Sequence, residues 1–185
     1  MPETPTFGRY AEIPYDQMTP EQWKLFVAVH NNAPMALSRA LVHEMMHQKW
    51  GRIVNITTSL GTMIREGSPT YGPSKAALEA FSAIMAKDLA GTGVTVNVLV
   101  PGGVTNTPMV PLAAGYDRAE MIQPTVMAPP LNWLVSDAAT GVTGRRFLAV
   151  HWDPSLPPEE AAAKAGAPVA WTDIATMPIE PPRRN

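Results

Sequence analysis

The sequence has no cysteine and comparatively few charged residues. A chain without cysteine forms neither a disulfide framework nor a thiolate metal site. Charged residues make up 16% of its 185 residues, and 14 basic against 16 acidic side chains leave a formal net charge of −2. This balance offers no basic surface to nucleic acid or acidic lipid, so we expect neither as a partner. The apolar fraction of 45% is ordinary for one globular domain.

Targeting and membrane signals are also missing from the sequence. The first residues, Met1 to Pro5, contain neither the basic nor the apolar region of a signal peptide. There is no run of about 18 uncharged apolar residues, so we expect no segment to cross a membrane. A cytoplasmic protein is therefore expected.

Proline is the residue present in excess. The chain has 20 prolines, which is roughly twice the average usage. They concentrate at the two ends, so we divide the chain into a Pro-rich N-terminal segment (1–18), a compact domain (19–152) and a Pro-rich C-terminal tail (153–185).

Helical and strand patterns alternate along the compact domain. Helices are predicted over 19–49, 71–90 and 129–136, with a further short helix over 158–165 in the tail. Strands are predicted over 51–58, 95–100 and 145–150. This alternation predicts an α/β fold with parallel strands and right-handed crossovers, in which the active site lies beyond the carboxyl ends of the strands.

The first helix has a clear start and a predicted kink. Thr19 can cap it, and Gln22 completes a capping box. Pro34 has no N–H to donate to the carbonyl of His30, four residues earlier, so the helix should kink around His30, Asn31 and Asn32.

The sharpest chemical pattern is a tyrosine and a lysine four residues apart, Tyr71 and Lys75. Residues with this spacing share one face of a helix, and an ammonium beside a phenol stabilises the phenolate. Such a tyrosine can act as a general acid or base near neutral pH. Two hydroxyl residues, Thr58 and Ser59, follow the preceding strand, and Pro101 begins a Pro-Gly turn after the next one.

With these motifs in this order, the chain resembles the short-chain dehydrogenase/reductase family. The similar stretches are 51–58, Tyr71 with Lys75, 97–102, 107–109, 134–137 and 142–144. The resemblance spans about 19–150 and implies a Rossmann-like doubly wound parallel sheet, represented by its C-terminal three strands. It also implies hydride transfer between NAD or NADP and a small-molecule carbonyl or alcohol, and a homo-oligomer formed through the helices at about 20–49 and 71–90.

The resemblance assigns roles to individual residues. Tyr71 would exchange the hydroxyl proton, and Lys75 would assist it and hold the nicotinamide ribose. Thr58, alone or with Ser59, would form a hydrogen bond with the reacting oxygen of the substrate. His30 or Asn31 would support a water relay. The residues that would contact the cofactor are Tyr71, Lys75, Pro101, Gly102, Val104 and Thr107.

Four departures from the family pattern qualify these assignments. The glycine-rich phosphate-binding segment is missing from the sequence, and Thr58 stands where the family usually has serine. Counting from Trp23 aligns His30 with the family's asparagine, whereas counting back from the strand aligns Asn31. The turn from Pro101 to Thr107 also has one extra residue.

The alternative function is that of a non-catalytic remnant or assembly module of the same fold. We expect the 185 residues alone to self-associate through the open edge of the strand at 51–58 and not to bind NAD(P) measurably.

Two other groups of residues, a histidine-containing motif and a pair of arginines, are interpreted as ordinary surface. The stretch from His43 to His47 fits H-E-x-x-H, a zinc hydrolase motif. The longer metzincin form fails, because Trp50 and Ile53 stand where glycine and histidine belong, so no metal is expected. Arg145 and Arg146 are expected at a solvated strand edge.

Overall fold

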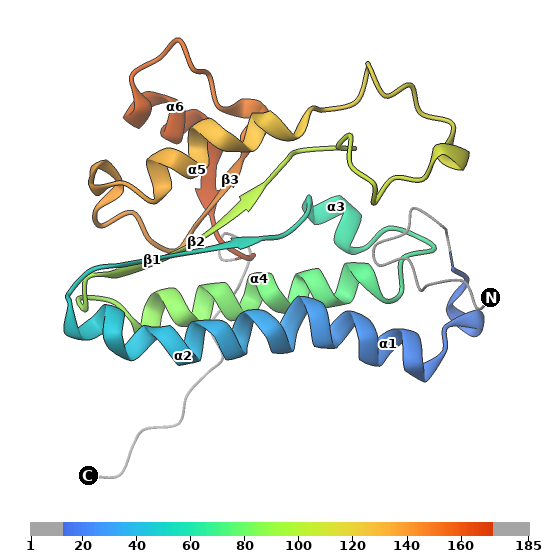
Figure 1. Ribbon diagram of the computed structural model, residues 1–185, viewed down its shortest axis with the longest axis horizontal. Coiled ribbons are helices and arrows are strands. Elements are labelled where there is room, and N and C mark those ends of the chain that lie inside the picture. The colour runs from blue at the N-terminus through green and yellow to red at the C-terminus, as the bar shows by residue number, and fades with distance from the viewer. Residues whose placement is uncertain (1–12, 172–185) are drawn as a thin grey trace.

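The computed structural model describes residues 13–171, which form an open sheet with helices on both faces (Figure 1). The helices are α1 (Pro20–Val27), a π-helix (Ala28–Asn32), α2 (Ala33–His47), α3 (Leu60–Met63), α4 (Tyr71–Asp88), α5 (Ala128–Leu134) and α6 (Pro158–Ala165). The strands are β1 (Gly51–Ile56), β2 (Val94–Val100), β3 (Arg145–Leu148) and β4 (Gly166–Pro168). Short 3-10 turns occur at Tyr15–Gln17, Leu112–Ala114, Pro124–Met127, Asp137–Ala139 and Ala149–His151.

The sheet has the order β1-β2-β3-β4. β1 pairs in parallel with β2, from Gly51 opposite Val94 to Ile56 opposite Leu99, and β2 pairs in parallel with β3. These pairings confirm the predicted parallel α/β fold. The antiparallel strand β4 was not predicted, and it pairs with β3 at the sheet edge. Residues 158–168 of the expected tail thus pack on the sheet.

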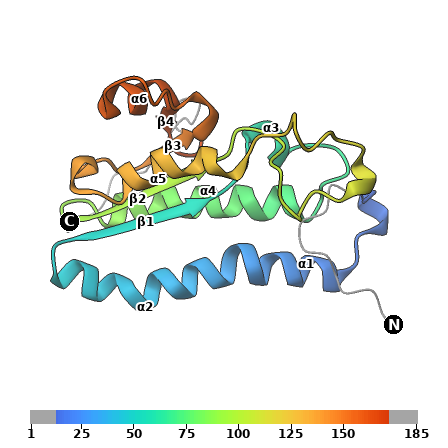
Figure 2. The same ribbon diagram turned by 45° about the horizontal axis from the view of Figure 1, so that its top comes forward.

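The two faces of the sheet carry different helices, as Figures 1 and 2 show: α1, α2 and α4 lie on one face, and α5 and α6 on the other. β2 lies between β1 and β3, and all its residues are buried. Its side chains alternate, with Val96 and Val98 toward α4 and Leu99 toward α5. Full burial of each such side chain contributes about 1.5–3 kcal/mol, so β2 is the core of the fold.

The first helix begins and bends where predicted. The Thr19 hydroxyl accepts the Gln22 N–H at 3.2 Å, and the Gln22 side chain accepts the Thr19 N–H at 2.9 Å, which completes the capping box. At the kink, the π-helix carries a bond from the Ala33 N–H to the Ala28 carbonyl, five residues back. In an α-helix the residue at position 34 would donate to the carbonyl of His30. Because Pro34 has no N–H, that bond cannot form, and the wider π-helical turn is accommodated at this position.

Element ends differ from the predicted ones by a few residues. β1 ends at Ile56 rather than at 58, and β3 ends at Leu148 because a 3-10 turn follows. The short helix α3 lies between the strand predicted to end at 58 and the helix predicted to begin at 71, where neither a helix nor a strand was predicted. In residues 13–171, no helix is both long and apolar enough to cross a membrane.

Candidate active site

The carboxyl end of β1 and the first turn of α4 form the centre of the candidate site. Tyr71 is the first residue of α4, and Lys75 follows one turn later. Gly72 permits this placement, because a Cβ there would collide with the Met63 carbonyl of α3. In Figure 1 the chain leaves β1 and β2 on the side where α4 begins. The sheet edge predicted to hold the site therefore lies beside the Tyr-Lys pair.

Lys75 is bound to the end of β1. Its Nζ donates to the Ile56 carbonyl at 2.9 Å and lies 5.8 Å from the centre of the Tyr71 ring. Burial lowers the pKa of Lys75 to about 8, because the charged ammonium loses water. The amine thus keeps its proton at neutral pH, close to the tyrosine.

His30 contacts the same turn of α4 from the π-helix. Its ring meets those of Phe26 and Tyr71 edge-on, each at 5.4 Å between centroids. Its Nδ1 lies 2.9 Å from the Ser74 hydroxyl, which itself donates to the Tyr71 carbonyl at 2.8 Å. Since a hydroxyl has one proton, Nδ1 must be the donor, and Nε2 is left as an acceptor.

The charge state of His30 follows from its surroundings. Burial, and secondly the nearby charge of Lys75, lower the pKa of His30 to about 4. The imidazole is therefore neutral at physiological pH.

Asn31 binds the same serine. Its Nδ2 donates to the Ser74 carbonyl at 2.8 Å. His30 and Asn31, the two alternatives for the position of the family's asparagine, thus both reach Ser74, which lies between Tyr71 and Lys75 on α4. They hold the kink of the first helix against α4.

The two hydroxyl residues after β1 differ in their surroundings. The Ser59 hydroxyl shares a hydrogen bond of 2.7 Å with the Thr62 hydroxyl, at the start of α3. Thr58 is partly exposed, and its backbone carbonyl accepts Nη2 of Arg146 at 3.1 Å. Ile56 of β1 pairs with Leu99 of β2. Thr58 lies two residues beyond Ile56 and Pro101 two residues beyond Leu99, so Thr58 and Pro101 lie at the same edge of the sheet.

The turn after β2 follows a path that requires glycine. Gly102 has φ +109°, and a Cβ there would collide with Val150, whose N–H bonds the Pro101 carbonyl at 3.2 Å. The loop beyond it folds back on itself, since the Ile122 N–H donates to the Val104 carbonyl at 3.1 Å. The turn is therefore held in place at both ends.

Sequence reasoning missed Arg118, which organises this loop. Its guanidinium donates to the Asn106 side chain at 2.8 Å, to the Thr107 carbonyl at 3.1 Å and to the Val110 carbonyl. The available signal was a single basic residue in the loop 104–128, because the five donors of an arginine can tie several carbonyls together.

The interpretation of Arg146 as a solvated residue was wrong. Arg146 is 5% exposed, and its Nε lies 2.8 Å from Oε1 of Glu79, which is fully buried. Glu79 lies two helical turns after Tyr71, on the face of α4 that meets the sheet. A glutamate on an otherwise small or apolar face was the signal that sequence reasoning overlooked.

His43 and His47 are exposed on α2. Within the described part of the chain, no group of three histidine, cysteine or carboxylate side chains is placed to hold a metal.

Comparison with known proteins places the chain in a family. The short chain dehydrogenase family model matches residues 8–114. The chain is 32% identical over 137 residues to the 3-oxoacyl-[acyl-carrier-protein] reductase of Synechocystis sp., which covers 71% of this chain and 56% of that protein. It is 31% identical over 137 residues to the corresponding reductase of Escherichia coli, covering 69% and 56%. The chain thus spans about half the length of these curated relatives.

Solved structures agree with the sequence relatives. A short chain dehydrogenase from Salmonella enterica serovar Typhi matches with a TM-score of 0.69 at 29% identity, over 77% of this chain and 59% of that one. A Shigella flexneri structure complexed with NADP matches with a TM-score of 0.68 at 27% identity, over 75% and 58%. The family match covers more than half of the chain, and the chain belongs to the short chain dehydrogenase family.

Proposed function

We propose that this chain carries the catalytic residues of an NAD- or NADP-dependent short-chain dehydrogenase/reductase acting on a small-molecule alcohol or carbonyl. The observation that carries the proposal is the Tyr71–Lys75 pair on one face of α4, with Lys75 bound to the carboxyl end of β1. The names of the relatives support it, since they are reductases, and a related structure holds NADP.

Tyr71 is the proton donor and acceptor in this proposal. Lys75 favours the phenolate through its charge, and its pKa of about 8 keeps it largely protonated at neutral pH. The bond to the Ile56 carbonyl orients the ammonium. A tyrosine supported in this way supplies general acid–base catalysis, which contributes typically about 10²–10⁴-fold to a rate.

Thr58 is the better candidate to bond the reacting oxygen. Both residues are partly exposed, but the Ser59 hydroxyl is already engaged with Thr62, whereas the bond that the structure records for Thr58 is made by its backbone carbonyl. A hydroxyl held at the reacting oxygen stabilises the charge that develops there in the transition state.

His30 and Asn31 support the site from the helix kink. The Asn31 side chain is engaged with Ser74, so we assign it an anchoring role. His30 is neutral and presents Nε2 as an acceptor. The backbone carbonyl of His30 is a second acceptor, because Pro34 has no N–H to donate to it. Both acceptors suit the relay that would return a proton to Lys75.

The residues present fit the nicotinamide end of a dinucleotide. The Lys75 ammonium has three donors, of which the Ile56 carbonyl takes one, so others can serve ribose hydroxyls. Tyr71, Pro101, Gly102, Val104 and Thr107 would complete the contact. When bound, the cofactor supplies or accepts the hydride.

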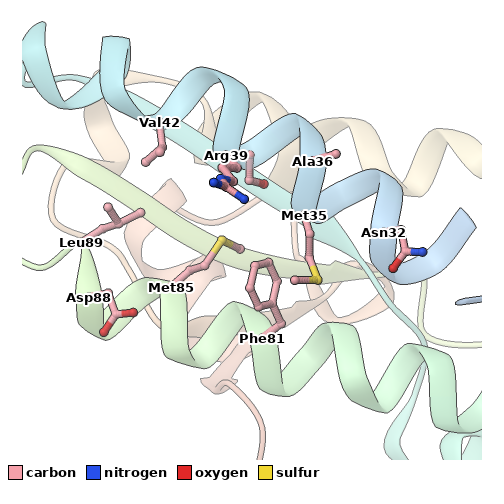
Figure 3. Close-up of a pocket in the computed structure, with 10 residues that line it drawn as sticks. Asn32, Met35, Ala36, Arg39, Val42, Phe81, Met85, Asp88 and Leu89 are labelled. Carbon is pink, nitrogen blue, oxygen red and sulfur yellow. The ribbon is translucent and has the colours of Figure 1, made fainter. Parts of the chain in front are cut away.

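A homo-oligomer through α2 and α4 is part of the proposal. The two helices flank a groove of about 520 Å³, and Figure 3 shows Met35, Phe81 and Met85 lying between them. Its walls also hold Arg39 and Asp88, of opposite charge. A second copy related by a two-fold axis that passes between Arg39 and Asp88 would place each arginine opposite the partner's aspartate, and such self-complementary charges suit pairing with a second copy.

The direct test is turnover by the protein purified from its host, so that any further polypeptide belonging to it is retained. We expect oxidation of NADH or NADPH, followed by absorbance, with at least one carbonyl from a panel that includes a 3-oxoacyl thioester and a keto acid of a sugar. Folded protein that transfers hydride in neither direction, with either cofactor, would instead support the non-catalytic alternative.

A further inference from the structure

We propose that the buried ion pair between Glu79 and Arg146 is a positioning device that fixes the Thr57–Thr58 segment relative to Tyr71. This inference rests on the proposed function, because it concerns the placement of Thr58 for the reaction. Neither side chain of the pair contacts a candidate reacting group. Glu79 would act through the hydroxyl of Thr57, and Arg146 through the backbone carbonyl of Thr58.

The pair is placed where charge is costly. Glu79 is fully buried and Arg146 is 5% exposed, and both lie between α4 and the sheet. Removing two charges from water costs several kcal/mol per ion, and apolar replacements of similar volume are often equally stable. Stability alone therefore gives a weak account of this pair, and its contacts indicate a more specific role.

Both members of the pair bind the segment that follows β1. The Thr57 hydroxyl donates to Oε2 of Glu79 at 2.7 Å, and Nη2 of Arg146 donates to the Thr58 carbonyl at 3.1 Å. The Thr57 N–H donates to the Leu99 carbonyl at 3.3 Å, which continues the sheet. Residues 57 and 58 are thus held from the helix, from β3 and from β2.

The geometry of α4 links this grip to the acid–base pair. Glu79 lies one helical turn after Lys75, which binds the Ile56 carbonyl. Successive turns of one helix therefore hold residues 56 and 57 of the strand end. Because Tyr71 lies one turn earlier on the same rigid element, α4 sets where Thr58 lies relative to the phenol.

A nearby hydrogen bond provides a matched control. Nδ2 of Asn55 donates to the Ser82 hydroxyl at 2.9 Å, and both groups are buried between β1 and α4. This bond joins the same two elements, but it lies two residues before Thr57 and touches nothing beyond the strand end. Ser82→Ala thus removes one buried β1–α4 bond without releasing Thr58.

The first measurement is independent of activity. Hydrogen–deuterium exchange is followed by mass spectrometry in wild type, Thr57→Val and Ser82→Ala, each purified from the host. We expect faster exchange across residues 57–60 in Thr57→Val but not in Ser82→Ala. Arg146→Lys keeps a positive charge for Glu79 yet lacks the fork that also reaches the Thr58 carbonyl, so it should match Thr57→Val. Equal exchange in all four proteins would overturn the proposal.

The second measurement is a kinetic cycle. Thr57→Val should lower kcat about tenfold or more with little change in the KM for the cofactor, because small misplacements at a reacting centre are costly. Thr57→Ser should retain wild-type kcat. In a Thr58→Val background, Thr57→Val should cause no further loss, because the residue it positions is already gone.

The outcomes separate the two claims. An equal loss of kcat from Thr57→Val in both backgrounds, or an equal loss from Ser82→Ala, would show that the pair does not act through Thr58. Near-normal kcat in Tyr71→Phe would instead reject the proposed function, while the exchange data would still decide whether the ion pair holds residues 57–60.

Discussion

The Nδ1 atom of His30 lies 2.9 Å from the Ser74 hydroxyl oxygen, and this bond joins the kink of the first helix to the turn of α4 between Tyr71 and Lys75. Because Ser74 donates its own proton to the Tyr71 carbonyl, the bond requires a proton on Nδ1 of His30. The neutral ring satisfies this requirement without gaining a second charge beside Lys75.

The lowered pKa of His30 predicts a pH dependence of stability. The folded-state pKa is about 4, against about 6.5 in the unfolded chain, so the unfolded state binds more protons between these values. The free energy of unfolding should therefore fall as pH decreases from about 6.5 to about 4, by at most about 1.4 kcal/mol per pH unit from this group. Denaturant unfolding measured across this range checks it.

The comparison variants isolate the effect from other titrating groups. His30→Gln should flatten the dependence, whereas His43→Gln, at an exposed position on α2, should leave the slope of the wild type. Parallel curves for His30→Gln and wild type would show that His30 does not carry the effect.

Thr58 and Ser59 can be distinguished by single-group deletions. Thr58→Val keeps the shape and removes the hydroxyl, so kcat should fall on the order of 10²-fold, as when one oxyanion donor is lost. Ser59→Ala removes a group already engaged with Thr62 and should have a mild effect. Steady-state kinetics of the two variants give the ranking, and the reverse order would move the role to Ser59.

The histidines of α2 should be irrelevant to activity. His43→Gln and His47→Gln together should leave turnover unchanged, because no third ligand lies near them in the described residues. Elemental analysis of the purified protein checks for metal. Stoichiometric zinc that a chelator removes together with activity would contradict this.

The open edge of β1 predicts the behaviour of the 185 residues expressed alone. Within the described residues, β1 pairs on one side only, with β2, and an unpaired strand edge is a template for association. Light scattering should show self-association, reduced by Ile56→Lys, which places a charge on the half-exposed end of the strand. Calorimetric titration should show no measurable binding of NAD or NADP. A monodisperse monomer that binds either at micromolar strength would contradict this account.

Local signals in the sequence were sufficient for much of the fold. The capping box at Thr19 and the missing N–H of Pro34 act within one or two turns, so they could be interpreted without tertiary contacts. The alternation of helices and strands likewise indicated parallel pairing, and the order β1-β2-β3 follows it. The Tyr71 and Lys75 spacing placed both on one face of α4, as the structure has them.

The features that sequence reasoning missed depend on distant partners. β4 is a Gly-Ala-Pro segment without strand propensity, and it pairs because β3 offers it an open edge. Arg146 is buried only because Glu79, 67 residues earlier, neutralises it. A pairing over that separation leaves no periodic signal, so a charged residue at that position was assigned to the surface.

The most direct test of the central claim is the kcat of Tyr71→Phe in protein purified from its host. The substitution removes one hydroxyl and keeps the ring that packs against His30, so the thermal unfolding midpoint should change little. Tyr15→Phe makes the same change at an exposed tyrosine outside the site and serves as the control. We predict loss of turnover by at least about 10²-fold in Tyr71→Phe and none in Tyr15→Phe. Near-normal kcat in Tyr71→Phe would contradict the assignment of this tyrosine as the acid–base group.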